Sequence, residues 1–263
     1  MSGEAVTIVV PARYASSRFP GKPLVPLKGA SGAEKTLVVR AWEAAMAPTG
    51  VDRVIVATDD DRIAEAVRDC GAEVAMTSPE ARNGTERCAE VVASLDLSGI
   101  VVNLQGDAPL TPPWFVEALI AAMRADPTID VATPVLRCSD GALADFRADR
   151  ATGRVGGTLA VLDRNGRALY FSKEVIPFGA GGEVPAWHHV GVYAFRAAAL
   201  AAYMELAPGM LETAEGLEQL RFLEHGLPVT CVPVDARGAH FWEVNNPEDV
   251  ERVEAALQSR GIA

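Results

Sequence analysis

The sequence predicts an α/β fold with a doubly wound, mostly parallel sheet and a smaller β-rich second lobe. Apolar strand patterns alternate with helical patterns over residues 6–125, which is typical of a parallel sheet covered by helices. From Asp130 the β-rich segments become longer, and Arg164-Asn165-Gly166 predicts a turn between antiparallel strands. The 263 residues suffice for one domain. We divide it into a half over about 1–130, a lobe over about 131–245 and a closing helix over 247–260.

The elements of the first half follow from hydrophobic patterns. The β-branched run Val6–Val10 predicts a buried strand that stops at Pro11 and leads into a loop over 12–24. Further strands are expected over 51–58, 71–77 and 99–105, and helices over 36–47, 60–70, 84–95 and 112–125. We expect Asp59 to cap the second helix and Thr85 the third, because short polar side chains accept hydrogen bonds in a first turn.

The second lobe mixes strands with helices. Strands are expected within 131–138, 156–172, 188–195 and 229–234, and helices over 197–207, 212–226 and 247–260. In a doubly wound sheet, ligands bind beyond the carboxyl ends of the strands. Functional residues are therefore expected in the loops that follow strands.

Charge and composition argue against several classes of protein. A net charge of −11, from 24 basic and 35 acidic residues, is unsuited to a broad nucleic-acid or anionic-membrane surface. The N-terminus lacks a secretory pattern, and no apolar run approaches the roughly 18 residues of a membrane span. The four cysteines have no metal-binding or disulfide spacing. We expect a globular, cytoplasmic protein without nucleic-acid or membrane partners.

The loop after the first strand predicts an anion site. Residues 13–22 contain Arg13, Arg18 and Lys22 and no acidic residue, in a chain that is acidic overall. Backbone N–H groups of such a loop can bind phosphate oxygens while the cations neutralise their charge. A solvated basic loop is the plainer interpretation. The loop has neither the P-loop pattern nor the glycine pattern of dinucleotide-binding folds, which disfavours an ATPase or a dehydrogenase.

Motifs along almost the whole chain resemble those of one enzyme family. They are PARYASSRFPGKPL, VIVATDDDRI, MTSPEARNGTERCAEV, NLQGDAPL, ALYFSKEVIPF, HHVGVYAF, LEQLRFLEHG and VNNPEDVERV. In this order they resemble the motifs of the 3-deoxy-D-manno-octulosonate (Kdo) cytidylyltransferases, or CMP-Kdo synthetases. The resemblance implies a Rossmann-like nucleotidyltransferase that transfers CMP from CTP to the anomeric hydroxyl of Kdo and releases pyrophosphate. It also implies Mg²⁺, a homodimer, and a role in lipopolysaccharide or capsule synthesis in a Gram-negative bacterium.

The resemblance implies that residues in the loops of the first half of the chain bind CTP. Phosphoryl transfer mainly needs positioning and positive charge, and Arg13 and Lys22 would stabilise the α-phosphate and the leaving pyrophosphate. Asp107 would hold magnesium, whereas from its residue type alone a turn cap is an equally good interpretation. The acidic run Asp59–Asp61 is explained more simply as a helix cap than as a metal motif. The CTP-binding residues implied are Pro11, Ala12, Arg13, Ser17, Arg18, Lys22, Arg82, Asn83, Gly84, Thr85 and Gln105.

The acidic sugar is assigned to the second lobe, which would also supply the dimer contacts. The residues implied are Lys173, His189, Tyr193, Glu215, Glu218 and Gln219. Glu215 and Gln219 stand four apart in a predicted helix and should share a face. Without the resemblance, an amphipathic helix with buried leucines explains this segment better. His188 and His189 face opposite ways on a strand, and only the H-x-G-x-Y match selects His189.

Departures from the family pattern affect the metal and the sugar. Asn245 stands where the family usually has an aspartate as its second metal carboxylate, and Glu243 is the candidate replacement, because residues two apart on a strand share a face. Lys173 replaces a typical arginine, and Leu159 a lysine. Two alternatives therefore stay open. One is a cytidylyltransferase for another acid sugar, such as 8-amino-Kdo or a nonulosonate, and the other is a catalytically silent homologue that binds CTP or a CMP-sugar.

Overall fold

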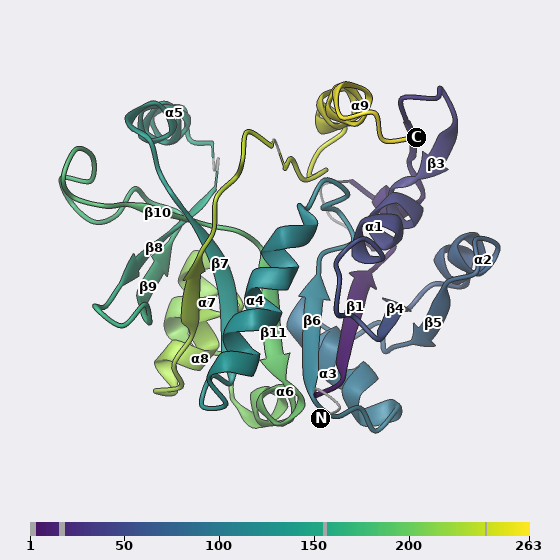
Figure 1. The fold of residues 1–263 in the computed structure, drawn as a ribbon, viewed down its shortest axis with the longest axis horizontal. Helices are drawn as coiled ribbons and strands as arrows, with labels where there is room; N and C mark the ends of the chain where they lie inside the picture. The colour runs from purple at the N-terminus through teal and green to yellow at the C-terminus, as the bar shows by residue number, and fades with distance from the viewer. Residues whose placement is uncertain (1–3, 16–18, 155–156, 240) are drawn as a thin grey trace.

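A computed structural model describes residues 4–15, 19–154, 157–239 and 241–263 of the chain. Within these ranges, ten strands form one sheet with helices packed on both faces (Figure 1). The first half of the chain contributes parallel pairs and the second half mostly antiparallel ones. The predicted α/β class is therefore confirmed. None of the described helices combines the length and apolar character needed to cross a lipid bilayer.

The parallel half is buried from both sides. Its strands, in sheet order, are β5 (Glu73–Met76), β4 (Arg53–Thr58), β1 (Val6–Ala12) and β6 (Ile100–Leu104). One face packs against α1 (Leu37–Ala45), α2 (Asp61–Arg68) and α4 (Pro113–Ala125). The other packs against α3 (Gly84–Ser94), α6 (Ala197–Glu205) and α8 (Leu220–Glu224). Apolar side chains on both faces of each strand explain why these strands read as continuous hydrophobic runs.

The β-rich half continues the same sheet. Its strands are β7 (Val131–Arg137), β8 (Thr158–Leu162), β9 (Ala168–Ser172), β10 (Trp187–His189), β11 (Val192–Arg196) and β12 (Thr230–Pro233). Both β10 and β11 pair with β7 on one side, while on their other side β11 pairs with β6 and β10 with β8. The sheet therefore forks at Val190 and Gly191, which lie between β10 and β11 and line the cavity described below.

Pro11 lies inside the first strand, so the expected strand end was wrong. Pro11 pairs with Ala57 of β4, and β1 runs on to Ala12. Proline is tolerated here because pairing with β6 stops at Val9, so that side needs no further N–H donor. The carbonyl of Pro11 instead accepts a hydrogen bond from Gly106 N at 3.2 Å.

Two expected helix caps belong to neighbouring residues. Asp60, rather than Asp59, caps α2, because its Oδ1 accepts from Arg62 N at 3.0 Å. Asn83, rather than Thr85, caps α3 by accepting from Glu86 N at 2.8 Å. Thr85 is already inside the first turn, and the side chain that reaches free N–H groups is that of the residue just before the helix.

Some of the remaining described elements were expected from the sequence and others were not. Those not expected from the sequence are the 3-10 helix η1 (Lys22–Leu24), the strands β2 (Pro26–Lys28) and β3 (Glu34–Thr36), and α5 (Asp140–Ala151). The predicted closing helix is present as α9 (Asp249–Ser259), and Val253 and Leu257 pack it against Leu27 of β2. The predicted helix over 212–226 is two short helices, α7 (Met210–Glu215) and α8.

Candidate active site

A cavity of about 1260 Å³ lies beyond the carboxyl ends of β1 and β6. In Figure 1 the arrowheads of these strands point toward the end of the molecule where α5 and α9 lie. The cavity joins segments far apart in the sequence. The predicted site residues that line it are Arg13, Arg82, Asn83, Gly84, Gln105, Asp107, His189, Tyr193, Glu218, Gln219, Glu243 and Asn245.

Other predicted site residues do not themselves line the cavity. They are Pro11, Ala12, Lys22, Thr85, Lys173 and Glu215. Ser17 and Arg18 lie outside the described residues. Ala12 and Thr85 are buried beneath the cavity lining, at 3% and 2% exposure, so their side chains support the loops that follow them.

Lys22 and Asp107 connect the loop after β1 with the loop after β6. Lys22 Nζ donates to Asp107 Oδ2 at 2.6 Å, and the two side chains are 12% and 26% exposed. Gly21, just before Lys22, adopts the left-handed region with φ 72°, and its N–H donates to the carbonyl of Tyr14. A cation and a carboxylate from separate loops thus meet beside Arg13, which is exposed at the cavity.

Gly106 lets the two loops approach closely. A Cβ at this position would lie 2.5 Å from the carbonyl oxygen of Pro11, which is backbone and cannot move aside cheaply. The absence of a side chain also allows the Gly106 N–H to reach that oxygen. The glycine of the Gln105-Gly106-Asp107 motif therefore places both neighbouring side chains at the cavity.

The first turn of α3 forms a polar rim beside these loops. The side chain of Asn83 caps this turn. Gly84 leaves room for Gln105, because a Cβ at position 84 would lie 3.0 Å from Nε2 and 3.2 Å from Oε1 of that side chain. The N–H of Thr85 donates to Glu218 Oε2 at 3.2 Å. This rim presents both donors and acceptors, as recognition of a pyrimidine edge requires.

Glu215 and Gln219 do not share a helix face, so that expectation was wrong. Gly216 ends α7 in the left-handed region, with φ 61°, and α8 begins only at Leu220. Gln219 is 2% exposed and lines the cavity. Glu215 turns to the end of β9 instead, where it accepts from Ser172 Oγ at 2.6 Å and from the N–H of Lys173 at 3.0 Å.

The two adjacent histidines face opposite sides of the sheet, as expected. His189 packs against Phe171 and Tyr193, whereas His188 packs against Phe146 and Phe241. Burial lowers the pKa of His188 to about 4 and, together with His188, that of His189 to about 3. Both imidazoles are therefore neutral at pH 7, and His189 can offer a hydrogen bond without charge.

Glu243 and Asn245 are brought to Asp107 by the backbone. Val244 N donates to the carbonyl of Asp107 at 2.9 Å, and Asn245 Nδ2 donates to Glu243 Oε2 at 3.2 Å. The segment is not a strand, although its two side chains meet as expected. Carboxylate and amide oxygens from two loops are a donor set that fits magnesium.

The acidic run after β4 has a structural role, as expected. Asp60 caps α2, and Asp59 pairs with Arg87 at 3.3 Å. Among the described residues, no three His, Cys, Asp or Glu side chains group closely enough to hold a metal by themselves. Phosphate oxygens of a nucleotide would have to complete a magnesium shell at Asp107, which is usual for this ion.

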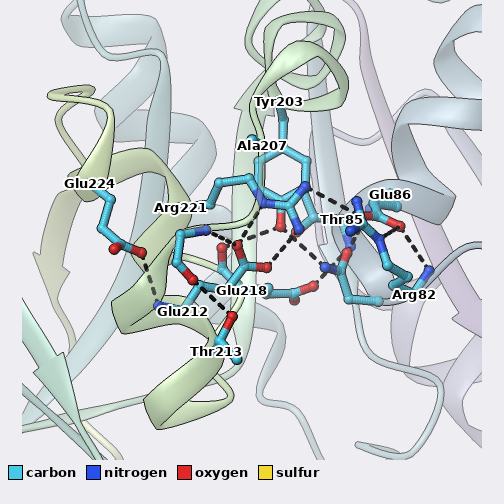
Figure 2. A network of polar contacts seen from close by, with 12 residues as sticks. Arg82, Thr85, Glu86, Tyr203, Ala207, Glu212, Thr213, Glu218, Arg221 and Glu224 are labelled. Atoms are coloured by element: carbon cyan, nitrogen blue, oxygen red, sulfur yellow. Dashed lines mark hydrogen bonds and ion pairs between the residues drawn. The ribbon is translucent and has the colours of Figure 1, made fainter.

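Sequence reasoning missed a cluster of buried charges in the wall of the cavity. Glu86, Glu212 and Arg221 are almost fully buried and join α3 to α7 and α8 (Figure 2). Burial opposes ionisation of Glu86, yet contacts with Arg82 and Arg221 lower its pKa below the usual range. The only sequence signal was the Asn83-x-x-Glu86 spacing, which is typical of a capped first turn.

Comparisons with known proteins show the family of the chain. A family model described as cytidylyltransferase matches residues 7–229. The chain is 44% identical over 260 residues to the 3-deoxy-manno-octulosonate cytidylyltransferase of Maricaulis maris, covering 98% of both chains. It is 40% identical to the mitochondrial 3-deoxy-manno-octulosonate cytidylyltransferase of Arabidopsis thaliana, covering 97% of this chain and 84% of the relative.

Solved structures agree as well. One of CMP:2-keto-3-deoxy-manno-octonic acid synthetase complexed with CTP matches with a TM-score of 0.85 and 35% identity, covering 97% of this chain and 99% of that chain. A cytidylyltransferase structure from Leptospira borgpetersenii shares the fold, with a TM-score of 0.62, 16% identity and coverage of 96% and 86%. The resemblance seen in the motifs is confirmed. The chain belongs to the cytidylyltransferase family, and within it to the 3-deoxy-manno-octulosonate cytidylyltransferases.

Proposed function

We propose that this chain transfers CMP from CTP to the anomeric hydroxyl of 3-deoxy-D-manno-octulosonate, giving CMP-Kdo and pyrophosphate. The observation that carries the proposal is the meeting, in one cavity, of cations after β1, a carboxylate after β6, a polar rim on α3 and a polar segment from α7 to α8. The first three suit a nucleoside triphosphate and the fourth suits a polyhydroxy acid. The curated relatives carry the corresponding name.

The reaction forms a bond between the sugar hydroxyl oxygen and the α-phosphorus and breaks the bond between the α- and β-phosphates. The hydroxyl proton is released, and the leaving group is pyrophosphate. Arg13 and Lys22 would neutralise charge on the phosphates as it shifts toward the leaving group. Because Lys22 is fixed by Asp107, its ammonium is held in place before the substrate arrives.

The acceptor would occupy the part of the cavity between α8 and the fork in the sheet. Neutral His189, Tyr193 and the buried Gln219 line this part and can hydrogen-bond hydroxyl groups. A Cβ at Gly216 would lie 3.1 Å from Lys173 Nζ, so this ammonium group brings a positive charge to the segment between α7 and α8. A sugar carboxylate is the matching partner for such a charge.

Magnesium is proposed as the cofactor, and the donor set at Asp107 fits it. Asp107, with Asn245 and Glu243 beside it, would supply protein oxygens, and a bound ion would neutralise phosphate charge. Asn245 is neutral, so Asn245 and Glu243 together bring one negative charge fewer than two carboxylates would. A homodimer and a cytoplasmic location also remain proposals. The four free cysteines support a reducing compartment, and sedimentation of the purified chain would test the dimer.

Pyrophosphate release tests the function. The purified chain is incubated with CTP and Mg²⁺ together with Kdo, 8-amino-Kdo, N-acetylneuraminate or no sugar. We expect release with Kdo that stops when Mg²⁺ is chelated. Pyrophosphate release with only another acid sugar would keep the chemistry and refute the Kdo assignment. CTP binding without pyrophosphate release in the presence of any of the sugars would favour a silent homologue.

A further inference from the structure

Arg221 stands at the centre of a buried ion network in the wall of the cavity. Its side chain is 1% exposed and makes two hydrogen bonds to Glu212, from Nε to Oε2 at 2.7 Å and from Nη2 to Oε1 at 2.6 Å. Its guanidinium also lies over the ring of Tyr203, 4.1 Å from the ring centre. Such paired, planar contacts hold the segment from α7 to α8 in one arrangement.

Glu86 of α3 is shared between this network and the rim of the cavity. Its Oε1 accepts a hydrogen bond from Arg221 Nη1 at 3.2 Å and forms an ion pair with Arg82 Nη2 at 2.6 Å. Its Oε2 accepts from the backbone N–H of Arg82 at 2.8 Å. Arg82 is 57% exposed at the cavity, whereas Glu86 is 4% exposed. One buried carboxylate therefore connects the exposed Arg82 with Arg221, which lines the cavity but is almost fully buried.

Three further hydrogen bonds connect the start of α3 with Glu218, two of them through Tyr203 of α6. Asn83 Nδ2 donates to the hydroxyl of Tyr203 at 3.1 Å, and that hydroxyl donates to the carbonyl of Glu218 at 3.3 Å. Thr85 N donates to Glu218 Oε2 at 3.2 Å. Figure 2 shows Arg221, Tyr203 and Glu218 between Thr85 and Glu86 of α3 on one side and Glu212 and Glu224 on the other.

We propose that Arg221, together with Tyr203, is a positioning residue that couples the binding of the nucleotide to the binding of the sugar acid. The inference rests on the proposed function, with the nucleotide at the polar rim on α3 and the acceptor beside Gln219, between α8 and the fork in the sheet. Neither Arg221 nor Tyr203 needs to touch the reacting atoms. Both act through Glu86, Asn83 and Glu218, which the two sites share.

The coupling follows from the shared contacts. A nucleotide that orders the rim fixes Arg82 and Asn83, and through them Glu86 and Tyr203. The α7–α8 segment is then already ordered when the acceptor arrives, so binding of the acceptor loses less conformational entropy. Each substrate therefore tightens the binding of the other. By linkage the effect is reciprocal, and couplings between ligand sites typically amount to about 5- to 150-fold in affinity.

Initial rates over a grid of CTP and sugar concentrations measure this coupling. They give the dissociation constant of CTP without sugar and its KM at saturating sugar, and we define the coupling ratio as the first divided by the second. The wild-type ratio is expected to be about 5 or more. Glu86→Gln, which weakens the link to Arg221, should bring the ratio close to 1, and Tyr203→Phe should lower it at least about twofold.

Glu224→Gln is the matched control. Glu224 accepts hydrogen bonds from Leu211 N and Glu212 N, so it supports α7 without a described contact to α3. This variant should retain the wild-type ratio. A purely structural role of Glu86 would weaken CTP binding equally with and without sugar and leave the ratio unchanged.

The outcomes separate this inference from the proposed function. If the wild-type enzyme makes CMP-Kdo with a coupling ratio of 1, the coupling is overturned and the function stays intact. The same holds if folded Glu86→Gln has the same coupling ratio as the wild type. Should Glu86→Gln not fold, Tyr203→Phe decides, because it removes one oxygen atom from the link. Absence of turnover with every acid sugar refutes the proposed function and the coupling with it.

Discussion

The ammonium of Lys22 and the carboxylate of Asp107 meet at 2.6 Å although 85 positions separate them in the chain. The pair connects the ends of two neighbouring parallel strands and lies beside the cavity. It holds a cation and a candidate metal ligand in position at the place where phosphates would bind. Several expected outcomes depend on this arrangement.

Replacement of Lys22 by methionine should lower the rate of pyrophosphate release about 10²- to 10³-fold, because one preorganised charge at the phosphates is lost. The matched control is Lys28→Met, which removes an exposed lysine on β2 that pairs with Glu34. The control should keep nearly full activity. Equal losses in the two variants would show that Lys22 acts only through net charge.

Asn245→Asp should lower the Mg²⁺ concentration that gives half-maximal rate, because a second carboxylate increases the negative charge of the donor set. Asp107→Asn should raise that concentration and lower the maximal rate. A titration of pyrophosphate release with Mg²⁺ measures both effects. An unchanged Mg²⁺ requirement in both variants would place the metal elsewhere.

Gly106→Ala should reduce kcat/KM about 10²-fold, because its Cβ would meet the Pro11 carbonyl at 2.5 Å and displace Gln105 and Asp107. Gly141→Ala in α5 is the control, since its nearest neighbour, Ser139 Oγ, lies 3.8 Å away. Steady-state kinetics compares the two. Full activity of Gly106→Ala would mean that the loops after β1 and β6 can separate without loss.

The stability of the chain should depend on Glu218 above pH 5. Burial raises the pKa of this carboxyl to about 7 from an ordinary value of 4.5. Between these two pH values the folded chain binds more protons than the unfolded chain, so the free energy of unfolding falls as pH rises. Glu218→Gln, which keeps an acceptor for Thr85 N, should be about 1–3 kcal/mol more stable than wild type at pH 8.

Urea unfolding at pH 5 and pH 8 checks this expectation. The advantage of Glu218→Gln should shrink strongly at pH 5, where the wild-type carboxyl is mostly protonated in the fold. Glu205→Gln removes an exposed carboxyl from α6 and serves as the control for the loss of one negative charge. A stability difference that is the same at both pH values would contradict the burial of a charged Glu218.

Local patterns in the sequence determined most of the secondary structure and the general position of the site. Alternating apolar runs predicted the parallel strands, and the motif order predicted which loops would meet, because the carboxyl ends of parallel strands share one edge. The errors were local. Asp59, Thr85 and Glu215 were misplaced because a cap or a helix break depends on one residue of register, as Gly216 shows.

Only the tertiary structure decided how charges are shared between distant elements. The sequence pointed to Arg13, Lys22 and Asp107 by their types and motifs, because those residues stand in the loops that follow readable strands. It could not reveal that Arg221 is buried between Glu212 and Glu86, or that Tyr203 connects Asn83 to Glu218. Such contacts arise from the packing of α3 against α6 and α8, and burial and pairing are properties of that packing rather than of any local pattern.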